Sequence, residues 1–279
     1  MLLNHSPQVR RTTQASPISV REFKPLPAME SVLKKKILLN MSLIGISLSL
    51  PVLAGPADYI YTPKIERGEL ELDIKYGTAT SNTSSHPEAS SIGLGYGMTE
   101  RWFTEGYLKQ KHDASGVSHY AEWENRFLLS STGDSAVDIG FVTELEAPLT
   151  VGSTWELRAG PLFQSQIEKL QLNGNLIFER VFGGSDEYGV AQVTNFGYQW
   201  QARYRWEKFL QFGIQGFGEL GKWNDWYPST EQNHRMGPAL FGKFSFDQQH
   251  AIKYNAAWLA GLSAASPATT LRVQIEYEF

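Results

Sequence analysis

The stretch that decides the fold is FGYQWQARYRW at residues 196–206, in which every second residue is apolar. The apolar set begins at Phe196 and ends at Trp206, and glycine, glutamine and arginine fill the positions between. Alternation with period two is typical of a β-strand that has one dry face and one wet face. The same period recurs at 91–98, where Ile92, Leu94, Tyr96 and Met98 are separated by glycines.

Working outward with turn residues as boundaries, we find this pattern along the chain from residue 68 to the C-terminus. No segment keeps a helical period of 3.6 residues. The alternation predicts an all-β fold of twelve strands at 68–80, 89–100, 102–113, 118–130, 135–149, 153–167, 169–183, 195–206, 210–221, 234–247, 250–263 and 267–279. The strand at 102–113 has the least distinct apolar face.

The lengths of these strands favour a transmembrane barrel. Most span 11 to 15 residues, whereas strands of soluble proteins are usually about five or six residues long and a tilted strand crosses a bilayer in about 9–11. Connections at 100–102, 130–135, 167–169, 206–210 and 247–250 are short, and most of the others are longer. Transmembrane barrels pair short periplasmic turns with long external loops. We therefore expect a single up-and-down antiparallel barrel at 58–279, with both termini periplasmic. A soluble lipocalin-like barrel is the alternative.

The first 57 residues are predicted to be an N-terminal extension and a cleavable leader. Lys34, Lys35 and Lys36 precede an uncharged stretch, 37–57, that ends in small residues. A basic region followed by a short apolar region and small residues describes a secretory signal peptide. We expect cleavage after Ala54 or Ala57 and translation to start at Met29. An uncleaved membrane anchor is the alternative.

Composition and charge exclude several classes of function. The chain has no cysteine, which excludes thiolate metal sites and cysteine nucleophiles. Residues 1–54 hold seven of the 25 basic and two of the 29 acidic residues, so that residues 55–279 carry a net charge of −9. Such an acidic chain has no electrostatic surface for nucleic acid. We expect no nucleic-acid partner.

The C-terminal strand, LRVQIEYEF at 271–279, resembles the last strand of Gram-negative outer-membrane proteins. From Asp58 through 251–256 to Phe279, the chain is similar to an uncharacterised proteobacterial family of porin-like outer-membrane barrels. The resemblance implies location in the outer membrane, contact with its lipid and lipopolysaccharide, and recognition by the barrel-assembly machinery through the strand that ends at Phe279. It implies no assigned activity, because a fold does not determine function.

The sequence identifies no catalytic or cofactor-binding residues. Outer-membrane lipid hydrolases share a His-x-Ser pair, and none of the histidines after residue 57 is followed by serine at the second position. A lipid-modifying enzyme would need a serine near His119. We regard an enzyme of this kind as the less favoured alternative. Histidines and acids expected near the external loops could form a metal site, and these residues are His112, Asp113, His119, Asp186, Glu231 and His234. Loop residues of these types are more often part of the solvated surface. We expect neither metal nor cofactor.

The inward-facing residues of the barrel are the most informative ones. By parity, twelve acidic and eight basic side chains face the lumen. The candidate lumen-lining residues are Glu71, Asp73, Lys75, Glu122, Glu124, Arg126, Asp138, Arg158, Arg203, Arg205, Lys243, Lys253, Arg272 and Glu276, and the same parity adds Glu69, Glu144, Glu156, Glu179, Glu219 and Glu278.

A polar lumen of mixed charge has two interpretations. Twelve strands lie between the eight that leave room only for side chains and the sixteen that enclose an open channel. The favoured interpretation is a narrow porin-like channel for small polar solutes, with a weak preference for cations because acids exceed bases. The alternative is a closed structural or ligand-binding barrel, in which paired charges or an inward-folded loop fill the lumen.

One predicted external loop, 221–237, is rich in aromatic residues and amides. Flat rings between amides and acids suit stacking on sugar faces or contact with lipopolysaccharide, and the alternative is an ordered lid at the membrane interface. The candidate recognition residues are Trp223, Trp226, Tyr227 and His234.

Overall fold

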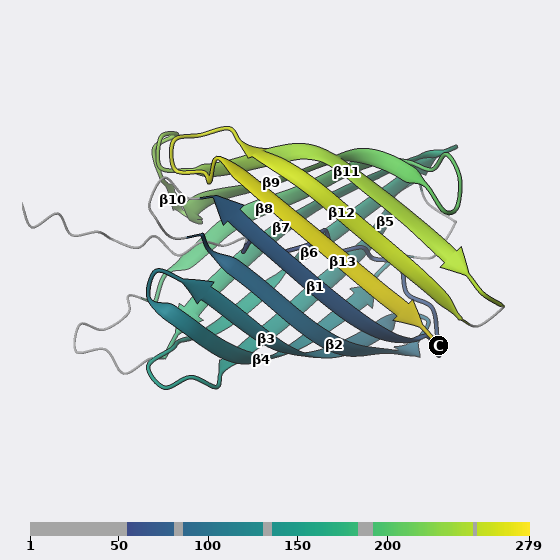
Figure 1. Ribbon diagram of the computed structural model, residues 1–279, viewed down its shortest axis with the longest axis horizontal. Coiled ribbons are helices and arrows are strands. Elements are labelled where there is room, and N and C mark those ends of the chain that lie inside the picture. Colours follow the sequence, from purple (N-terminus) through teal and green to yellow (C-terminus); the bar gives the residue numbers. More distant parts are fainter. Residues whose placement is uncertain (1–54, 81–85, 131–135, 184–191, 248–249) are drawn as a thin grey trace, which may run out of the picture. The chain divides into compact units, whose positions relative to one another are not determined.

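The computed structural model describes residues 55–80, 86–130, 136–183, 192–247 and 250–279. It contains thirteen strands, and all but one of them form the wall of a barrel (Figure 1). The strands are β1 (Leu70–Thr80), β2 (Glu88–Thr99), β3 (Trp102–Asp113), β4 (Gly116–Leu128), β5 (Asp138–Pro148), β6 (Trp155–Ile167), β7 (Leu170–Phe182), β8 (Thr194–Tyr204), β9 (Gln211–Lys222), β10 (Asp225–Trp226), β11 (Asn233–Ser245), β12 (Ala251–Gly261) and β13 (Thr269–Glu278). The leader predicted up to Ala54 lies outside the described residues.

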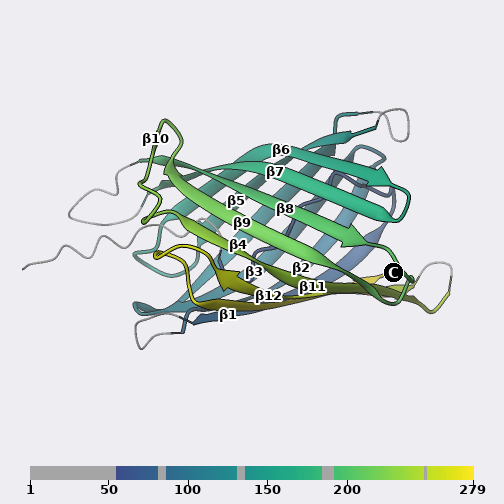
Figure 2. The same ribbon diagram turned by 90° about the horizontal axis from the view of Figure 1, so that it is seen from above.

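The wall is a closed antiparallel sheet. Apart from the short β10, each strand pairs with the next along the chain, so that β9 pairs with β11, and β1 pairs with β13 from Glu71↔Glu278 to Thr80↔Thr269. This seam lies in front in Figure 1, where the first and last strands run side by side. Figure 2 shows β8, β9 and β11 continuing the wall, with the two-residue β10 pairing only with β9 at one end. The predicted barrel of twelve strands is confirmed.

The alternation in the sequence has become a polar interior and an apolar exterior. In β1, Asp73 and Lys75 are 2% and 5% exposed, whereas Ile74 and Tyr76, which alternate with them, are both 46% exposed. Successive side chains of a strand point to opposite faces. The usual distribution of a soluble core is therefore inverted, which is what a barrel wall requires when lipid covers its outside. No helix in the described part of the chain combines the length and hydropathy needed to cross a bilayer.

Aromatic rings gather near both ends of the barrel. We call the end that holds Leu70 and Phe279 the C-terminal rim and the end that holds β10 the loop rim. Near the C-terminal rim, Trp102 stacks on Phe127 and Tyr204 lies against Phe212. Near the loop rim, Phe196 stacks on Trp226. Two such girdles are typical of barrels that cross a membrane, because amphipathic rings favour the interface between lipid and water.

Short and long connections are not separated between the two rims as clearly as the sequence predicts. At the C-terminal rim, nine residues separate Leu128 from Asp138, because β4 ends and β5 begins further from the turn than predicted. At the loop rim, only two residues separate Asp113 from Gly116. Gly116 has a φ of +120°, a conformation that glycine adopts without strain, and it permits this tight hairpin. Loop length alone therefore does not identify the external side.

Candidate functional site in the barrel lumen

Arg158 is the centre of one ionic cluster inside the barrel, where it meets four acidic side chains. Its guanidinium lies 2.7 Å from Glu156, 3.1 Å from Glu179 and 3.5 Å from both Glu144 and Asp58. The side chain of Arg158 is only 7% exposed. Five donors in a planar fork allow one guanidinium to serve several carboxylates at once. Arg158 thus joins β5, β6 and β7 and also holds Asp58, which precedes the first strand.

Lys109 forms a second cluster beside the first. Its Nζ contacts Glu122 and lies 2.8 Å from Glu146 and 3.8 Å from Glu144. Lys111 adds a bond of 2.6 Å to Glu146. The three glutamates are close enough for one oxygen of each to ligate a common ion. The ammonium of Lys109 already lies among them, so this group is explained as an ion-pair cluster.

A third cluster lies at the C-terminal rim. Lys253 is 3.1 Å from Glu69 and 3.4 Å from Glu276, and it also contacts Glu278. Lys243 contacts the same Glu278. These residues come from β11, β12, β13 and the residue before β1, so the cluster connects strands on both sides of the seam.

Amide side chains cover the wall between these clusters and β9. Gln215 donates to Gln201 at 2.6 Å, Gln201 donates to Asn173 at 3.3 Å, and Gln171 donates to the same oxygen of Asn173 at 2.9 Å. Such a chain of amides presents neutral donors and acceptors toward the lumen. It offers hydrogen bonds without a fixed charge.

The strands from β8 to β13 also carry arginines that lie against phenyl rings. The guanidinium groups of Arg235 and Arg272 lie 5.8 and 5.3 Å from the ring centre of Phe217, and that of Arg203 lies 4.6 Å from Phe241. Arg235 is paired with Glu219 at 3.3 Å. The lumen therefore has a strongly acidic wall, on β3 to β7, and a wall on β8 to β13 where arginines are more prominent.

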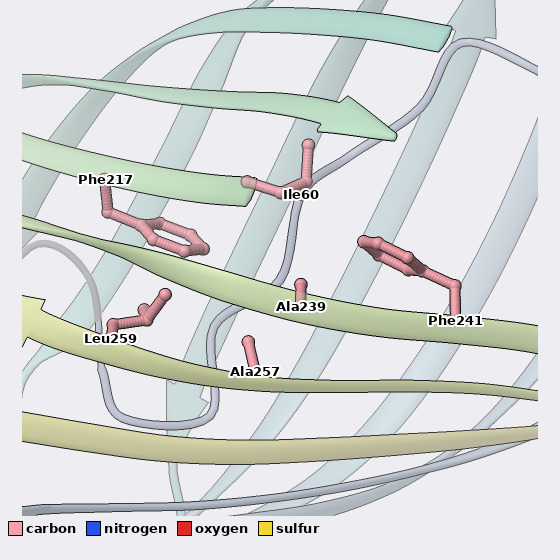
Figure 3. Close-up of a cluster of buried hydrophobic side chains, with 6 residues drawn as sticks. All are labelled: Ile60, Phe217, Ala239, Phe241, Ala257 and Leu259. Atoms are coloured by element: carbon pink, nitrogen blue, oxygen red, sulfur yellow. The ribbon is translucent and has the colours of Figure 1, made fainter. Parts of the chain in front are cut away.

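The lumen is not empty, because residues 55–69 run through it. We call this stretch the internal segment. Ile60 packs among Phe217, Ala239, Phe241, Ala257 and Leu259, which belong to β9, β11 and β12 (Figure 3). The next residue, Tyr61, packs on the other side against Val142, Leu162 and Ile177 of β5, β6 and β7. Two consecutive residues thus contact opposite walls of the barrel.

Polar bonds fix the internal segment to the acidic wall. The hydroxyl of Tyr59 donates to Glu124, and that of Tyr61 donates to Glu144 at 2.5 Å. The backbone oxygen of Tyr61 accepts a bond of 2.9 Å from Asn175. The ring of Tyr59 also covers the ammonium of Lys75, which lies 3.5 Å from the ring centre. Buried Tyr hydroxyls and carboxylates are costly without partners, so these bonds stabilise the segment in the lumen.

Glycines in the wall make room for the internal segment. A Cβ at Gly77 would lie 2.0 Å from the backbone oxygen of Pro56, and one at Gly97 would lie 2.0 Å from that of Glu66. A Cβ at Gly140 would lie 2.7 Å from the Cβ of Pro63. Real side chains do not approach so closely, so only glycine permits the segment to pass these three positions.

A small pocket remains beside the internal segment. It lies toward β7, β8 and β9, and its lining includes both the segment and the wall. The lining residues are Asp58, Arg158, Ile177, Gly197, Tyr198, Gln199, Gly218 and Glu219.

The structure places most of the candidate lumen residues inside the barrel. The residues that are buried are Glu71, Asp73, Lys75, Glu122, Glu124, Arg158 and Arg272, and those that are half-buried are Arg126, Asp138, Arg203, Lys243, Lys253 and Glu276. Arg205 differs from the others, because it follows the end of β8 and is exposed at the C-terminal rim, where it donates to Gln166 at 2.7 Å. Their role in transport stays a prediction.

Sequence reasoning missed several lumen residues. Glu105 and Tyr107 of β3 are 2% and 3% exposed, and Lys109 and Lys111 of the same strand belong to the second cluster. The apolar face of this strand is interrupted by Gly106 and Gln110, so its parity is hard to read. Glu146 and Arg235 were also missed, although they share parity with the predicted Glu144 and Lys243.

The candidate recognition residues of the external loop lie at the loop rim. Trp223 and Trp226 are each 56% exposed, and Tyr227 is half-buried. His234 is the second residue of β11, where its Nδ1 is 3.0 Å from the hydroxyl of Tyr198 and its Nε2 is 2.9 Å from Gln232. Among the described residues, the histidines at 112, 119 and 234 form no group of metal ligands.

Comparison with known proteins identifies the fold. No protein-family model matches the sequence, and no curated protein matches it significantly. Among solved structures, the KdgM porin has a TM-score of 0.50 with 13% identity and covers 75% of this chain and 99% of its own. An outer membrane channel from Pseudomonas putida F1 has a TM-score of 0.51 with 12% identity and covers 81% and 98%. The NanC porin has a TM-score of 0.51 with 11% identity and covers 75% and 98%. The chain therefore has the fold of twelve-stranded outer-membrane porins.

Proposed function

We propose that the protein is a porin-like channel of the outer membrane that passes small polar solutes through a lumen narrowed by its internal segment. The observation that carries this proposal is the distribution of side chains on a closed wall, which is apolar toward the outside and charged or amidic toward the lumen. Lipid requires the first face, and the second face suits water, ions and polar solutes. The likeness in fold to porins supports the same function.

The direction of the chain in the membrane is part of this proposal. We propose that the C-terminal rim is periplasmic and the loop rim is external. We also propose that residues up to Ala54 are removed on export, because of the two expected cleavage sites, after Ala54 and after Ala57, only the first leaves Pro56 in the lumen beside Gly77. The last strand, which ends at Phe279, would be recognised by the barrel-assembly machinery. Exposed rings at both rims, such as Trp206 and Trp226, would contact the lipid interface and lipopolysaccharide.

The proposed selectivity follows from the charges in the lumen. Acidic side chains still exceed basic ones after Glu105, Glu146, Lys109, Lys111 and Arg235 are included. Charges that line a pore attract ions of opposite sign, so a weak preference for cations is expected. In planar bilayers with a salt gradient, the reversal potential should have the sign of cation selectivity at neutral pH. A reversal potential of the opposite sign would contradict this assignment.

A closed barrel is the second candidate, and the internal segment favours it. The segment contacts both walls at Ile60 and Tyr61, and Asp58 of the segment joins the ion pairs of Arg158. Conductance of the purified, refolded protein distinguishes the two functions. Discrete steps of current are expected for a channel. A change of mobility on a denaturing gel after heating shows that the barrel has folded, and a folded barrel that never conducts would refute the channel function.

A further inference from the structure

We propose that residues 55–69 form a displaceable plug, a segment that closes the channel and can leave the lumen without opening the barrel wall. This inference rests on the proposed channel function and adds to it the device that controls passage. It follows from three properties of the internal segment, which concern the wall around it, the bonds that hold it and the places where it is attached.

The barrel wall is complete without the segment. All twelve wall strands pair with two neighbours, including β1 with β13 and β8 with β9. None of these ladders includes a residue before Leu70. Because the segment contributes no strand, its departure would break no hydrogen bond between wall strands.

Side chains, rather than a backbone ladder, hold the central part of the segment. Between Pro56 and Ile65, the polar bonds to the wall in the described structure are the side-chain bonds of Asp58, Tyr59 and Tyr61 and two hydrogen bonds of the Tyr61 backbone. The amide of Tyr61 donates to Gln199 at 3.4 Å, and its carbonyl oxygen accepts from Asn175 at 2.9 Å. Each such bond contributes about 0.5–1.5 kcal/mol net, or about 1.5–3 kcal/mol where a charged group takes part. Displacement must break these bonds and the packing of Ile60 and Tyr61, but it leaves every strand of the closed wall paired.

The attachment of the segment differs between its two ends. At the C-terminal rim, Gly68 donates to the backbone oxygen of Gly97 at 2.8 Å, and Gly97 donates to that of Glu69 at 2.8 Å. Gly68 has a φ of +79°, which marks a sharp change of direction. From this point the segment runs up the lumen to Pro56, which lies against Gly77 in the half of β1 nearer the loop rim. Residues 66–69 therefore act as the hinge, and residues 55–65, which belong to no backbone ladder, act as the arm once the leader is removed as proposed.

The glycine at 77 shows that the wall is shaped for the arm in place. A side chain there would collide with the backbone of Pro56 and not merely with the end of a flexible side chain. A substitution at this position therefore pushes the arm away from the wall. Gly174 of β7 lies on the outer face of the wall, where a Cβ meets no atom within 4 Å, so it serves as a control for placing a β-branched residue in a wall strand without touching the arm.

The test compares three variants with the natural chain in planar bilayers. Gly77→Val is expected to displace the arm sterically, and Asp58→Asn combined with Tyr59→Phe and Tyr61→Phe is expected to release it from Arg158, Glu124 and Glu144. Both should raise the open probability or the step conductance several-fold. Gly174→Val should conduct like the natural chain.

A second measurement reports the arm directly. The chain has no cysteine, so Ile60→Cys introduces a single thiol. A water-soluble, membrane-impermeant thiol reagent should modify it slowly alone and several-fold faster when Gly77→Val is added. The same slow reaction in both backgrounds, with natural conductance in every variant, would overturn the plug and leave the channel. Faster labelling without current in any variant would refute the proposed channel and with it the closing role of the segment.

Discussion

Replacement of Arg158 tests whether paired charges hold the interior of the barrel together. In Arg158→Met, a side chain of similar length remains, but Glu144, Glu156, Glu179 and Asp58 lose a common partner. Removing one member of a buried ion pair costs about 3–5 kcal/mol, because a charge stays buried without compensation. We expect a loss in this range, since Glu179 is 0% exposed and Glu144 is 3% exposed.

The loss can be measured by urea unfolding of the refolded protein in lipid vesicles, followed by tryptophan fluorescence. With a dependence of about 2 kcal/mol per molar urea, the midpoint should fall by about 2 M. The control is Arg180→Met on the neighbouring strand, where the side chain is exposed and donates to Thr194 and Gln192. An exposed bond of this kind is worth about 0–1 kcal/mol. If Arg158→Met is no less stable than Arg180→Met, the ionic clusters do not stabilise the barrel.

Three further predictions concern the outside and the ends of the barrel. Leu94 lies in the middle of the outer face of β2 and is 57% exposed, so Leu94→Arg should lower the free energy of unfolding in lipid by about 2–4 kcal/mol. Met98→Arg, at the end of the same strand, should lower it by about 0–1 kcal/mol. Equal losses in the two variants would argue against a lipid-facing exterior. Trp223→Ala with Trp226→Ala should alter solute uptake or sugar binding and leave the heat-modified gel mobility unchanged, and unchanged uptake of every solute tested would remove this loop from the site. Deletion of Phe279 should reduce the amount of assembled barrel in the outer membrane, measured by fractionation, whereas normal assembly would show that the last residue is not needed for recognition.

The sequence predicts the wall well because each strand carries its own pattern. The alternation at 196–206 places β8 within two residues of its bounds, Thr194–Tyr204, and it also identifies which face is polar. Prediction weakens where the pattern is diluted. The polar face of β3 was missed because Gly106 and Gln110 interrupt its apolar face, although its Lys109 joins three glutamates.

The internal segment could not be predicted in the same way. Residues 58–65 have no sustained alternation, and their partners are far away in sequence. Tyr61 bonds to Glu144, which is 83 residues later, and Asn175 bonds to Tyr61 across 114 residues. Only the closed barrel brings these residues together. The glycines at 77, 97 and 140 are visible in the sequence, but the chain that occupies the space beside them is not.

The seam between β1 and β13 has a consequence for the order of assembly. The internal segment is made first and leads directly into β1, yet the ring of strands that encloses it closes only when β13, the last strand made, pairs with β1. Either the wall is wrapped around the segment, or a free end is threaded into a finished ring. On the threading route, a chain that kept residues 1–54 would have to pass all of them through the lumen beside Arg158 and Glu144. A shortened chain would pass only the arm that begins near Gly55. If the leader is removed on export as proposed, the timing of its removal relative to ring closure decides which of the two routes is open.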